Sequence, residues 1–206
     1  MKSGAFHATL QQLPVEKRRR IRQIRDRQAQ LQSIIGLKLV KLGFNQLRLR
    51  KFHLQKLYFS QHKPAIRNTN ASSGTNSDIG HFSISHSQNC ICCVISKNKP
   101  VGIDVERIRP LSPRLIDKYQ LGQSNIRNPI DNKISPITSW TQKEAIFKVI
   151  GEHQLHELKH IIVKQGSTTF KDHQYHVNSF TLNNKYIMSI ASLHPNTKIK
   201  IKRVYF

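Results

Sequence analysis

The stretch HFSISHSQNCICCVISKNKPVGIDVERI, residues 81–108, holds three short runs rich in β-forming residues, separated by the turn-like tripeptides SQN and NKP. Short runs with this punctuation are typical of strands joined by tight turns. We therefore predict a small antiparallel sheet over this part of the chain.

A helix and hairpin strands are predicted downstream of these runs. The segment SWTQKEAIFKVIGE, 139–152, has the pattern of a helix with Ser139 as its N-cap and Gly151 near its end. HIIVKQ, TTFKDHQYHV, NSFTL and KYIMSIAS then alternate as strands, with turns at Gly166 and Asn183-Asn184.

Upstream of the three runs, residues 14–44 place apolar side chains at helical spacing, with arginines on the other face. We expect two helical stretches there, broken near Gly36 or Gly43. The polar stretch 67–80 is rich in turn formers and is expected to be a mobile surface loop. The whole chain thus predicts an α+β fold, helix then strands twice, in two similar halves that meet near residue 103.

The chain of 206 residues carries 34 Lys and Arg against 11 Asp and Glu, a net charge of +23. Such a basic surface favours polyanionic partners, which include nucleic acid, acidic membranes, phosphorylated ligands and acidic proteins. No run is long and apolar enough to span a membrane, and the N-terminus lacks the apolar region of a secretory signal. We expect a cytoplasmic protein without a membrane partner.

All three cysteines lie in NCICCVIS, where a strand would point Cys90 and Cys92 to one face and Cys93 to the other. Cys90 and Cys93 have the spacing of half a zinc or redox site, but no second pair exists. We therefore predict reduced cysteines that pack as small apolar residues.

Two of the scarce acidic residues, Asp104 and Glu106, stand two apart in VGIDVERI. Side chains at this spacing face the same way in a strand, and paired carboxylates suit Mg²⁺. The alternative is an exposed strand face on which Arg107 and Arg109 balance the acids.

One stripe of the predicted helix at 139–152 presents Trp140, Glu144 and Lys148 at successive turns. Glu144 could serve as a base or metal ligand and Lys148 could neutralise a phosphate leaving group, or the two could form a surface ion pair. Lys143 points to a neighbouring face, from which it could contact another phosphate. His86, flanked by Ser85 and other serines in FSISHS, is either a phosphate contact or a structural histidine at a strand end.

In this order, HFSISHS, PVGIDVERI and SWTQKEAIFKVIG resemble the three-part signature of the 4'-phosphopantetheinyl transferases of the surfactin-synthetase-activating type. Upstream, Lys63-Pro64 and the following residues resemble a further segment of that family. Lys17, Arg20 and Ser33 match its N-terminal helical region. The resemblance touches most of the chain.

The resemblance implies a pseudo-twofold α+β enzyme whose halves, residues 1–103 and 104–206, enclose a cleft for coenzyme A and Mg²⁺. The first half would form the coenzyme A side and the second half would carry the catalytic and metal-binding residues. Asp104, Glu106 and Glu144 would bind Mg²⁺. Glu144 would also deprotonate a serine of an acyl or peptidyl carrier protein, and Lys148 would offset charge on the departing 3',5'-ADP.

Further residues are implied as contacts of coenzyme A. The positions matching those around its 3'-phosphate are Lys17, Arg20, Ser33 and His86, and those around its adenine are Lys63, Pro64 and Ser85. A monomer is implied because both halves come from one chain. The acidic residue that usually follows the second-half helix in relatives is missing, which leaves Gln123, Ser124 or water as the remaining metal ligand.

Two other functions compete with this one. A basic nucleic-acid-binding protein would explain the charge but neither the acid pair nor the Trp, Glu, Lys stripe, and aromatic residues are sparse among the arginines of residues 14–30. A catalytically impaired relative that binds coenzyme A without transferring its arm is the second alternative. The sequence does not distinguish fatty acid, polyketide or peptide synthesis as the pathway served.

Overall fold

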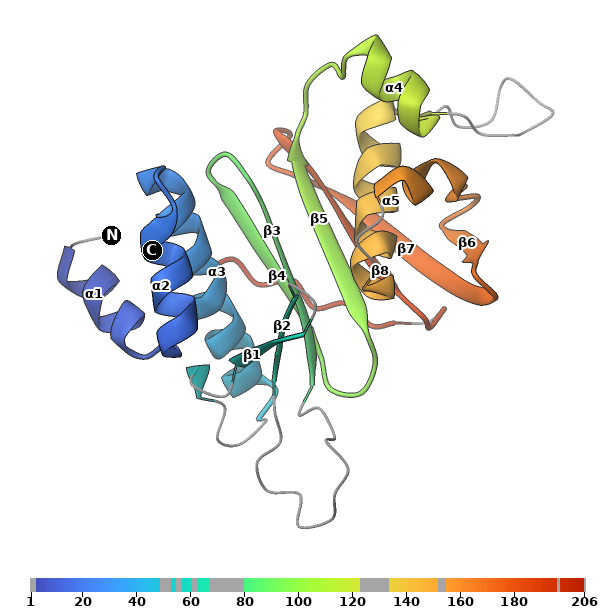
Figure 1. Ribbon diagram of the computed structural model, residues 1–206. Coiled ribbons are helices and arrows are strands. Elements are labelled where there is room, and N and C mark those ends of the chain that lie inside the picture. The colour runs from blue at the N-terminus through green and yellow to red at the C-terminus, as the bar shows by residue number, and fades with distance from the viewer. Residues whose placement is uncertain are drawn as a thin grey trace. The chain divides into compact units, whose positions relative to one another are not determined.

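The computed structural model describes residues 3–48, 53–54, 57–60, 63–66, 80–122, 134–151, 155–195 and 197–205. The chain divides into two compact units, of which the first comprises residues 1–82, 95–98 and 196–206, and the second 83–94 and 99–195. Helices and antiparallel strands both occur, so the predicted α+β class is confirmed (Figure 1). The pseudo-twofold relation and the boundary near residue 103 stay predictions.

Three helices open the first unit: α1 (Ser3–Gln11), α2 (Val15–Gln23) and α3 (Arg27–Gln46). The break between α2 and α3 falls at Asp26, whose side chain accepts hydrogen bonds from two backbone N–H groups of the first turn of α3. The prediction of a break near Gly36 or Gly43 is therefore wrong, and α1 was not predicted.

Both glycines lie inside α3, and at Gly43 packing requires a small residue. Gly36 is buried, and a Cβ on Gly43 would collide with the side chain of Ile95. Apolar residues of the three helices and of the connection between α1 and α2 supply much of the buried core of this unit: Phe6, Leu10, Leu13, Ile21, Ile34, Leu37, Val40 and Phe44. Two short strands, β1 (Leu57–Ser60) and β2 (Lys63–Ile66), pair antiparallel in the same unit.

The three runs of 81–108 are all strands, but they do not form one sheet. Among the described strands, β3 (His81–Ser87) pairs only with β4 (Cys90–Ser96), whereas β5 (Val101–Arg107) is the edge strand of a four-stranded antiparallel sheet ordered β5-β8-β7-β6. The predicted single small sheet is therefore wrong. Backbone N–H groups of β5 donate instead to serine side chains of β3, as described below.

The helices of the second unit are α4 (Pro113–Tyr119) and α5 (Pro136–Ile150). The N-cap of α5 is Ser135, not Ser139, because Pro136 occupies the first helical position, where its missing N–H costs nothing. Ser135 Oγ accepts a hydrogen bond from the backbone N–H of Thr138 at 3.3 Å. Gly151, at φ +88°, ends the helix as predicted.

The remaining sheet strands are β6 (Ser167–Phe170), β7 (His173–Leu182) and β8 (Tyr186–Ser192). The predicted turn at Asn183-Asn184 is confirmed, since both residues have positive φ. HIIVKQ is not a strand: a 3₁₀ helix, η2 (Leu155–His160), precedes it, and Ile161 is buried in the core.

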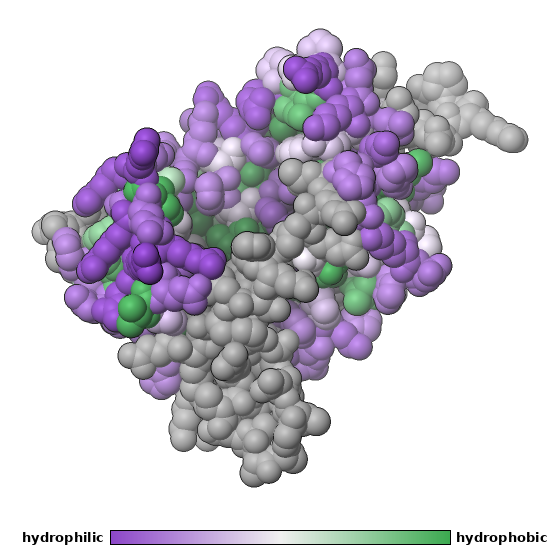
Figure 2. Space-filling model, viewed as in Figure 1, coloured by the Kyte–Doolittle hydropathy of each residue, from purple (hydrophilic) through white to green (hydrophobic). Residues whose placement is uncertain are grey.

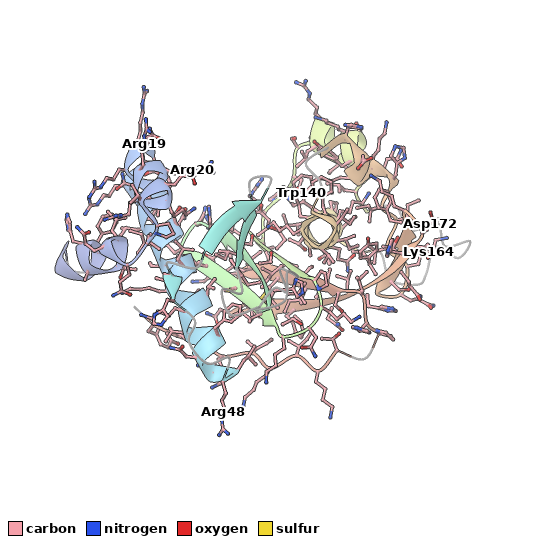
Figure 3. All side chains as sticks on the ribbon, turned by 60° about the horizontal axis from the view of Figure 1, so that its bottom comes forward. Arg19, Arg20, Arg48, Trp140, Lys164 and Asp172 are labelled. Carbon is pink, nitrogen blue, oxygen red and sulfur yellow. The ribbon has the colours of Figure 1, made fainter. Side chains whose placement is uncertain are left out.

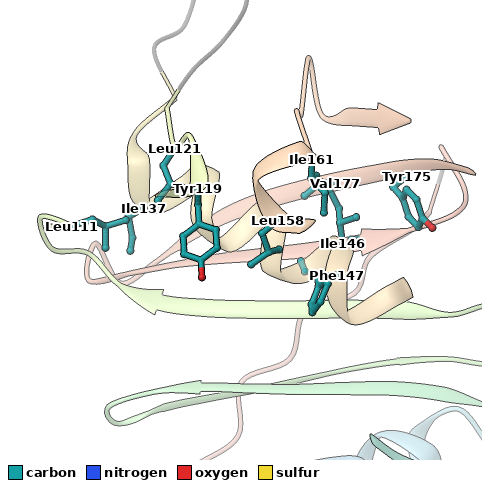
Figure 4. Packing of buried hydrophobic residues seen from close by; sticks show 12 residues of the cluster. Leu111, Tyr119, Leu121, Ile137, Ile146, Phe147, Leu158, Ile161, Tyr175 and Val177 are labelled. Atoms are coloured by element: carbon teal, nitrogen blue, oxygen red, sulfur yellow. The ribbon is translucent and has the colours of Figure 1, made fainter. Parts of the chain in front are cut away.

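An apolar cluster lies between α5 and the four-stranded sheet (Figure 4). Its members come from both layers and from α4 and η2: Leu111, Tyr119, Leu121, Ile137, Ala145, Ile146, Phe147, Leu158, Ile161, Tyr175, Val177 and Ala191. This packing holds α5 against the sheet. No helix among the described residues is long and apolar enough to cross a membrane.

Candidate active site

The close approach of β5 to α5 is made possible by Gly102. A Cβ at this position would collide with the backbone oxygen of Ala145 and contact Val149 at 3.0 Å, so any larger residue would push the helix away. Because side chains alternate along a strand, Asp104 lies on the same face as Gly102. The approach therefore brings Lys148 of α5 within reach of Asp104.

Asp104 is 6 % exposed and binds two donors through one oxygen. Its Oδ1 accepts hydrogen bonds from Lys148 Nζ and from Ser85 Oγ, both at 2.8 Å. Its Oδ2 is buried and has no hydrogen-bond partner in the part of the chain that the structure describes. A buried carboxylate oxygen without a donor is costly, and it is the kind of atom that a hard cation binds.

Alternate serines of β3 bond to β5 through their side chains. The hydroxyls of Ser83, Ser85 and Ser87 accept hydrogen bonds from the backbone N–H groups of residues 103, 105 and 107 at 3.1–3.3 Å. Ser85 also donates to Asp104, and Ser87 donates to Glu106 Oε2 at 2.9 Å. The serines therefore provide hydrogen-bond acceptors for the backbone N–H groups at the edge of β5. Ser85 and Ser87 also orient both predicted metal ligands. Ser83 and Ser87 were not assigned this role from the sequence, in which the only signal was the placement of serine at every second position of residues 83–87.

The residues fit a magnesium ion in part. Asp104 and Glu106 offer oxygen ligands on one strand face, and Asp104 Oδ2 lacks a donor within the described residues. Glu144 is partly exposed on α5. Within the described ranges, however, no three His, Cys, Asp or Glu side chains are grouped so that they could hold a metal ion by themselves. The three-carboxylate assignment therefore stays a prediction, and Gln123 and Ser124 lie outside the described residues.

The predicted stripe of Trp140, Glu144 and Lys148 on α5 does not serve one purpose: its first residue packs in the apolar core and its last residue reaches the candidate site. Trp140 packs against Tyr119, with ring centroids 5.2 Å apart, while Lys148 bonds to Asp104. Lys143 is 3 % exposed and donates to the backbone oxygen of Tyr119 at 2.7 Å, at the end of α4. Burial lowers the pKa of Lys143 to about 8. Its predicted phosphate contact stays a prediction.

A row of hydroxyls, buried at Ser189 and Thr141 and exposed at Ser179, continues from Asp104 across the sheet. Asp104 pairs in register with Ser189, which pairs with Ser179. Ser189 Oγ lies 2.8 Å from Thr141 Oγ1 and 2.9 Å from Ser179 Oγ. Gln142 of α5 donates to Ser179 Oγ at 3.2 Å. This row was missed from the sequence because its members are set side by side only by strand register.

The other predicted coenzyme A contacts are distributed over both units. Lys17, Arg20 and Ser33 lie on α2 and α3, and Arg20 forms an ion pair with Glu16 at 3.1 Å. Burial and the neighbouring Arg20 charge lower the pKa of Lys17. Hydrophilic residues dominate the surface over α2 (Figure 2), from which Arg20 projects (Figure 3).

Four predicted contacts lie on strands, and one of them is Ser85 of β3, whose bonds to β5 are described above. Lys63 and Pro64 are in β2, where they pair with Ser60 and Phe59, and His86 is exposed on β3. The roles of these residues toward coenzyme A stay predictions.

The fold and the site together define an α+β protein in which a buried aspartate, a second carboxylate and a lysine converge beside a helix, a set suited to phosphate ester chemistry. Two curated relatives agree with this class. The chain is 33 % identical over 112 residues to the 4'-phosphopantetheinyl transferase gsp of Aneurinibacillus migulanus, a match covering 52 % of this chain and 46 % of that protein. It is also 33 % identical over 101 residues to the 4'-phosphopantetheinyl transferase HetI of Nostoc sp. (strain PCC 7120 / SAG 25.82 / UTEX 2576), covering 46 % of this chain and 40 % of HetI.

Over about half of its length the chain is thus similar to two 4'-phosphopantetheinyl transferases, which confirms the resemblance found in its sequence. The matched region spans a little less than half the length of each relative. No protein-family model matches the chain.

Proposed function

We propose that this protein transfers 4'-phosphopantetheine from coenzyme A to a serine of an apo-carrier protein and releases 3',5'-ADP. The names of its two relatives support this reaction. The structural observation that carries the proposal is Asp104, whose Oδ1 binds Lys148 and Ser85 while Oδ2 is buried without a donor among the described residues.

The proposed reaction is a displacement at phosphorus. The carrier serine oxygen forms a bond to the phosphorus that bears the pantetheine arm, and the bond from that phosphorus to the bridging oxygen of the pyrophosphate breaks. The serine proton goes to Glu144, and the leaving 3',5'-ADP takes the bridging oxygen with its electron pair. Lys148, held beside the pyrophosphate by Asp104, would reduce the charge that develops on the leaving group.

Asp104 and Glu106, with Glu144, would hold Mg²⁺. Such an ion, when bound, supplies charge neutralisation at the pyrophosphate oxygens. Ser85 and Ser87 would keep the first two carboxylates in place, because each serine donates to one of them. An acidic acyl or peptidyl carrier is the proposed partner, since the chain carries a net charge of +23.

Mass spectrometry of an apo-carrier incubated with the protein, coenzyme A and Mg²⁺ tests the proposal. A carrier heavier by one phosphopantetheine arm is expected only when all components are present. An unmodified carrier together with calorimetric binding of coenzyme A would identify the impaired relative. If the carrier is not modified and coenzyme A does not bind, tight binding of nucleic acid would identify the basic nucleic-acid-binding protein.

A further inference from the structure

Two of the three cysteines on β4 converge. Cys90 and Cys92 lie on one face of the strand, and their sulfur atoms are 3.7 Å apart. Cys93 lies on the other face, where its thiol contacts the backbone oxygen of Val94. None of the three forms a disulfide within the described residues, and all three are partly exposed. Full burial does not occur, and the reduced state stays a prediction.

The separation of the two sulfurs matches the edge of a tetrahedral thiolate site. Zinc–sulfur bonds of about 2.3 Å in tetrahedral geometry place two sulfur ligands about 3.8 Å apart. Cys90 and Cys92 could therefore take two adjacent positions around one ion with little movement of either side chain. The C-x-x-C spacing of Cys90 and Cys93 pointed to a different pair, which the alternation of the strand places on opposite faces.

We propose that Cys90 and Cys92 form a two-thiolate binding site for a thiophilic divalent cation such as Zn²⁺. The site is open, because among the described residues no third His, Cys, Asp or Glu joins the pair in a group that could hold a metal ion. Water or a small external thiol would supply the other ligands, so the ion should exchange readily. Binding replaces the thiol protons, which pass to solvent.

This site is separate in chemistry from the proposed magnesium site. Mg²⁺ prefers oxygen ligands, whereas thiolates select softer ions, so Mg²⁺ should not compete at Cys90 and Cys92. The inference does not depend on the transferase activity, since the ion is bound by the protein alone. The competing explanation of the 3.7 Å distance is a simple thiol–thiol contact, which predicts no metal binding.

Absorption spectroscopy with Cd²⁺ tests the proposal on the full chain, reduced with a phosphine and free of coenzyme A. A thiolate-to-metal charge-transfer band should saturate at one ion per chain. Histidines can bind the same ion but do not give this band. Cys90→Ser and Cys92→Ser should each raise the Cd²⁺ concentration at which the band is half-saturated by at least about tenfold. Excess Mg²⁺ should leave this concentration unchanged.

Cys93→Ser is the matched control, because it removes a neighbouring thiol from the opposite face. It should keep the band and its midpoint. Circular dichroism checks that each variant is folded. No band in the unmodified protein, or equal loss of the band in the Cys93 variant, would overturn the proposal. Equilibrium dialysis with Zn²⁺ should rank the variants in the same order.

Discussion

Lys148 and Asp104 form an ion pair across the contact between α5 and β5, with Nζ 2.8 Å from Oδ1 and side chains that are 24 % and 8 % exposed. Removing one partner of an ion pair this sheltered destabilises the fold more than replacing both partners, because the remaining partner is left as an uncompensated charge.

Replacement of Lys148 by Met should therefore lower the free energy of unfolding by about 2–3 kcal/mol. The same substitution in an Asp104→Asn background should cost less, because the amide needs no counter-charge. Urea unfolding of the four proteins of this double-mutant cycle measures the difference as a coupling energy. Equal costs in both backgrounds would mean that the pair contributes nothing beyond its separate members.

Glu144→Gln should nearly abolish transfer while coenzyme A binding is largely retained, because the amide keeps the shape but cannot accept the serine proton. Initial rates by mass spectrometry and calorimetric titration of coenzyme A measure the two effects. Glu157→Gln is the matched control: it is the same change at a carboxylate that pairs with Lys171 at 3.0 Å, and it should leave turnover unchanged. Near-normal turnover of the Glu144 variant would remove Glu144 from the proposed mechanism.

Mg²⁺ and coenzyme A should bind with positive, reciprocal coupling. Because no three suitable side chains form a group within the described residues, the pyrophosphate should supply part of the magnesium coordination. Calorimetry of Mg²⁺ should show weak binding to the protein alone and tighter binding once coenzyme A is present. Asp104→Asn should weaken Mg²⁺ binding in both titrations. Identical affinities with and without coenzyme A would contradict the coupling.

Carrier docking should depend on ionic strength and on the cations at one end of the sheet. Arg107 and Lys185 line a cavity of about 450 Å³ together with Gln88, Ile108, Asn184 and Tyr186. Reversing both charges should raise the KM for an acidic carrier and leave the affinity for coenzyme A unchanged. Lys164→Glu, next to β6 at the opposite edge of the sheet, should not raise it. A KM that stays constant as salt rises would argue against electrostatic docking.

Lys143 should make stability depend on pH. Burial lowers its pKa from 10.5 in the unfolded chain to about 8, so between these values the unfolded state binds more protons and stability rises with pH. Below about pH 8 both states are protonated and the dependence disappears. Replacement by Met should flatten the rise between pH 8 and 10.5 relative to the unmodified protein, as measured by urea midpoints at each pH. Parallel curves for the two proteins would show that Lys143 titrates normally.

Much of this protein could be predicted from residues near one another in the chain. The α+β class, the strands of 81–108 and the glycine at the end of α5 follow from local periodicity and turn chemistry. The placement of Asp104 beside Glu106 on one strand face also needs only the alternation of a strand. The break of the N-terminal helices was misplaced because a glycine that permits close packing, as Gly43 does, has the same local signature as one that ends a helix.

The class of the fold, the acid pair and the similarity to 4'-phosphopantetheinyl transferases could all be inferred from the amino-acid sequence. The three-dimensional structure was needed to find that Lys148 pairs with Asp104, that serine side chains bridge β3 to β5, and that Lys143 turns inward to α4. The physical reason is that these contacts join segments 19–44 residues apart. Their partners are chosen by sheet register and by how closely a helix can approach a strand at Gly102, neither of which local sequence specifies.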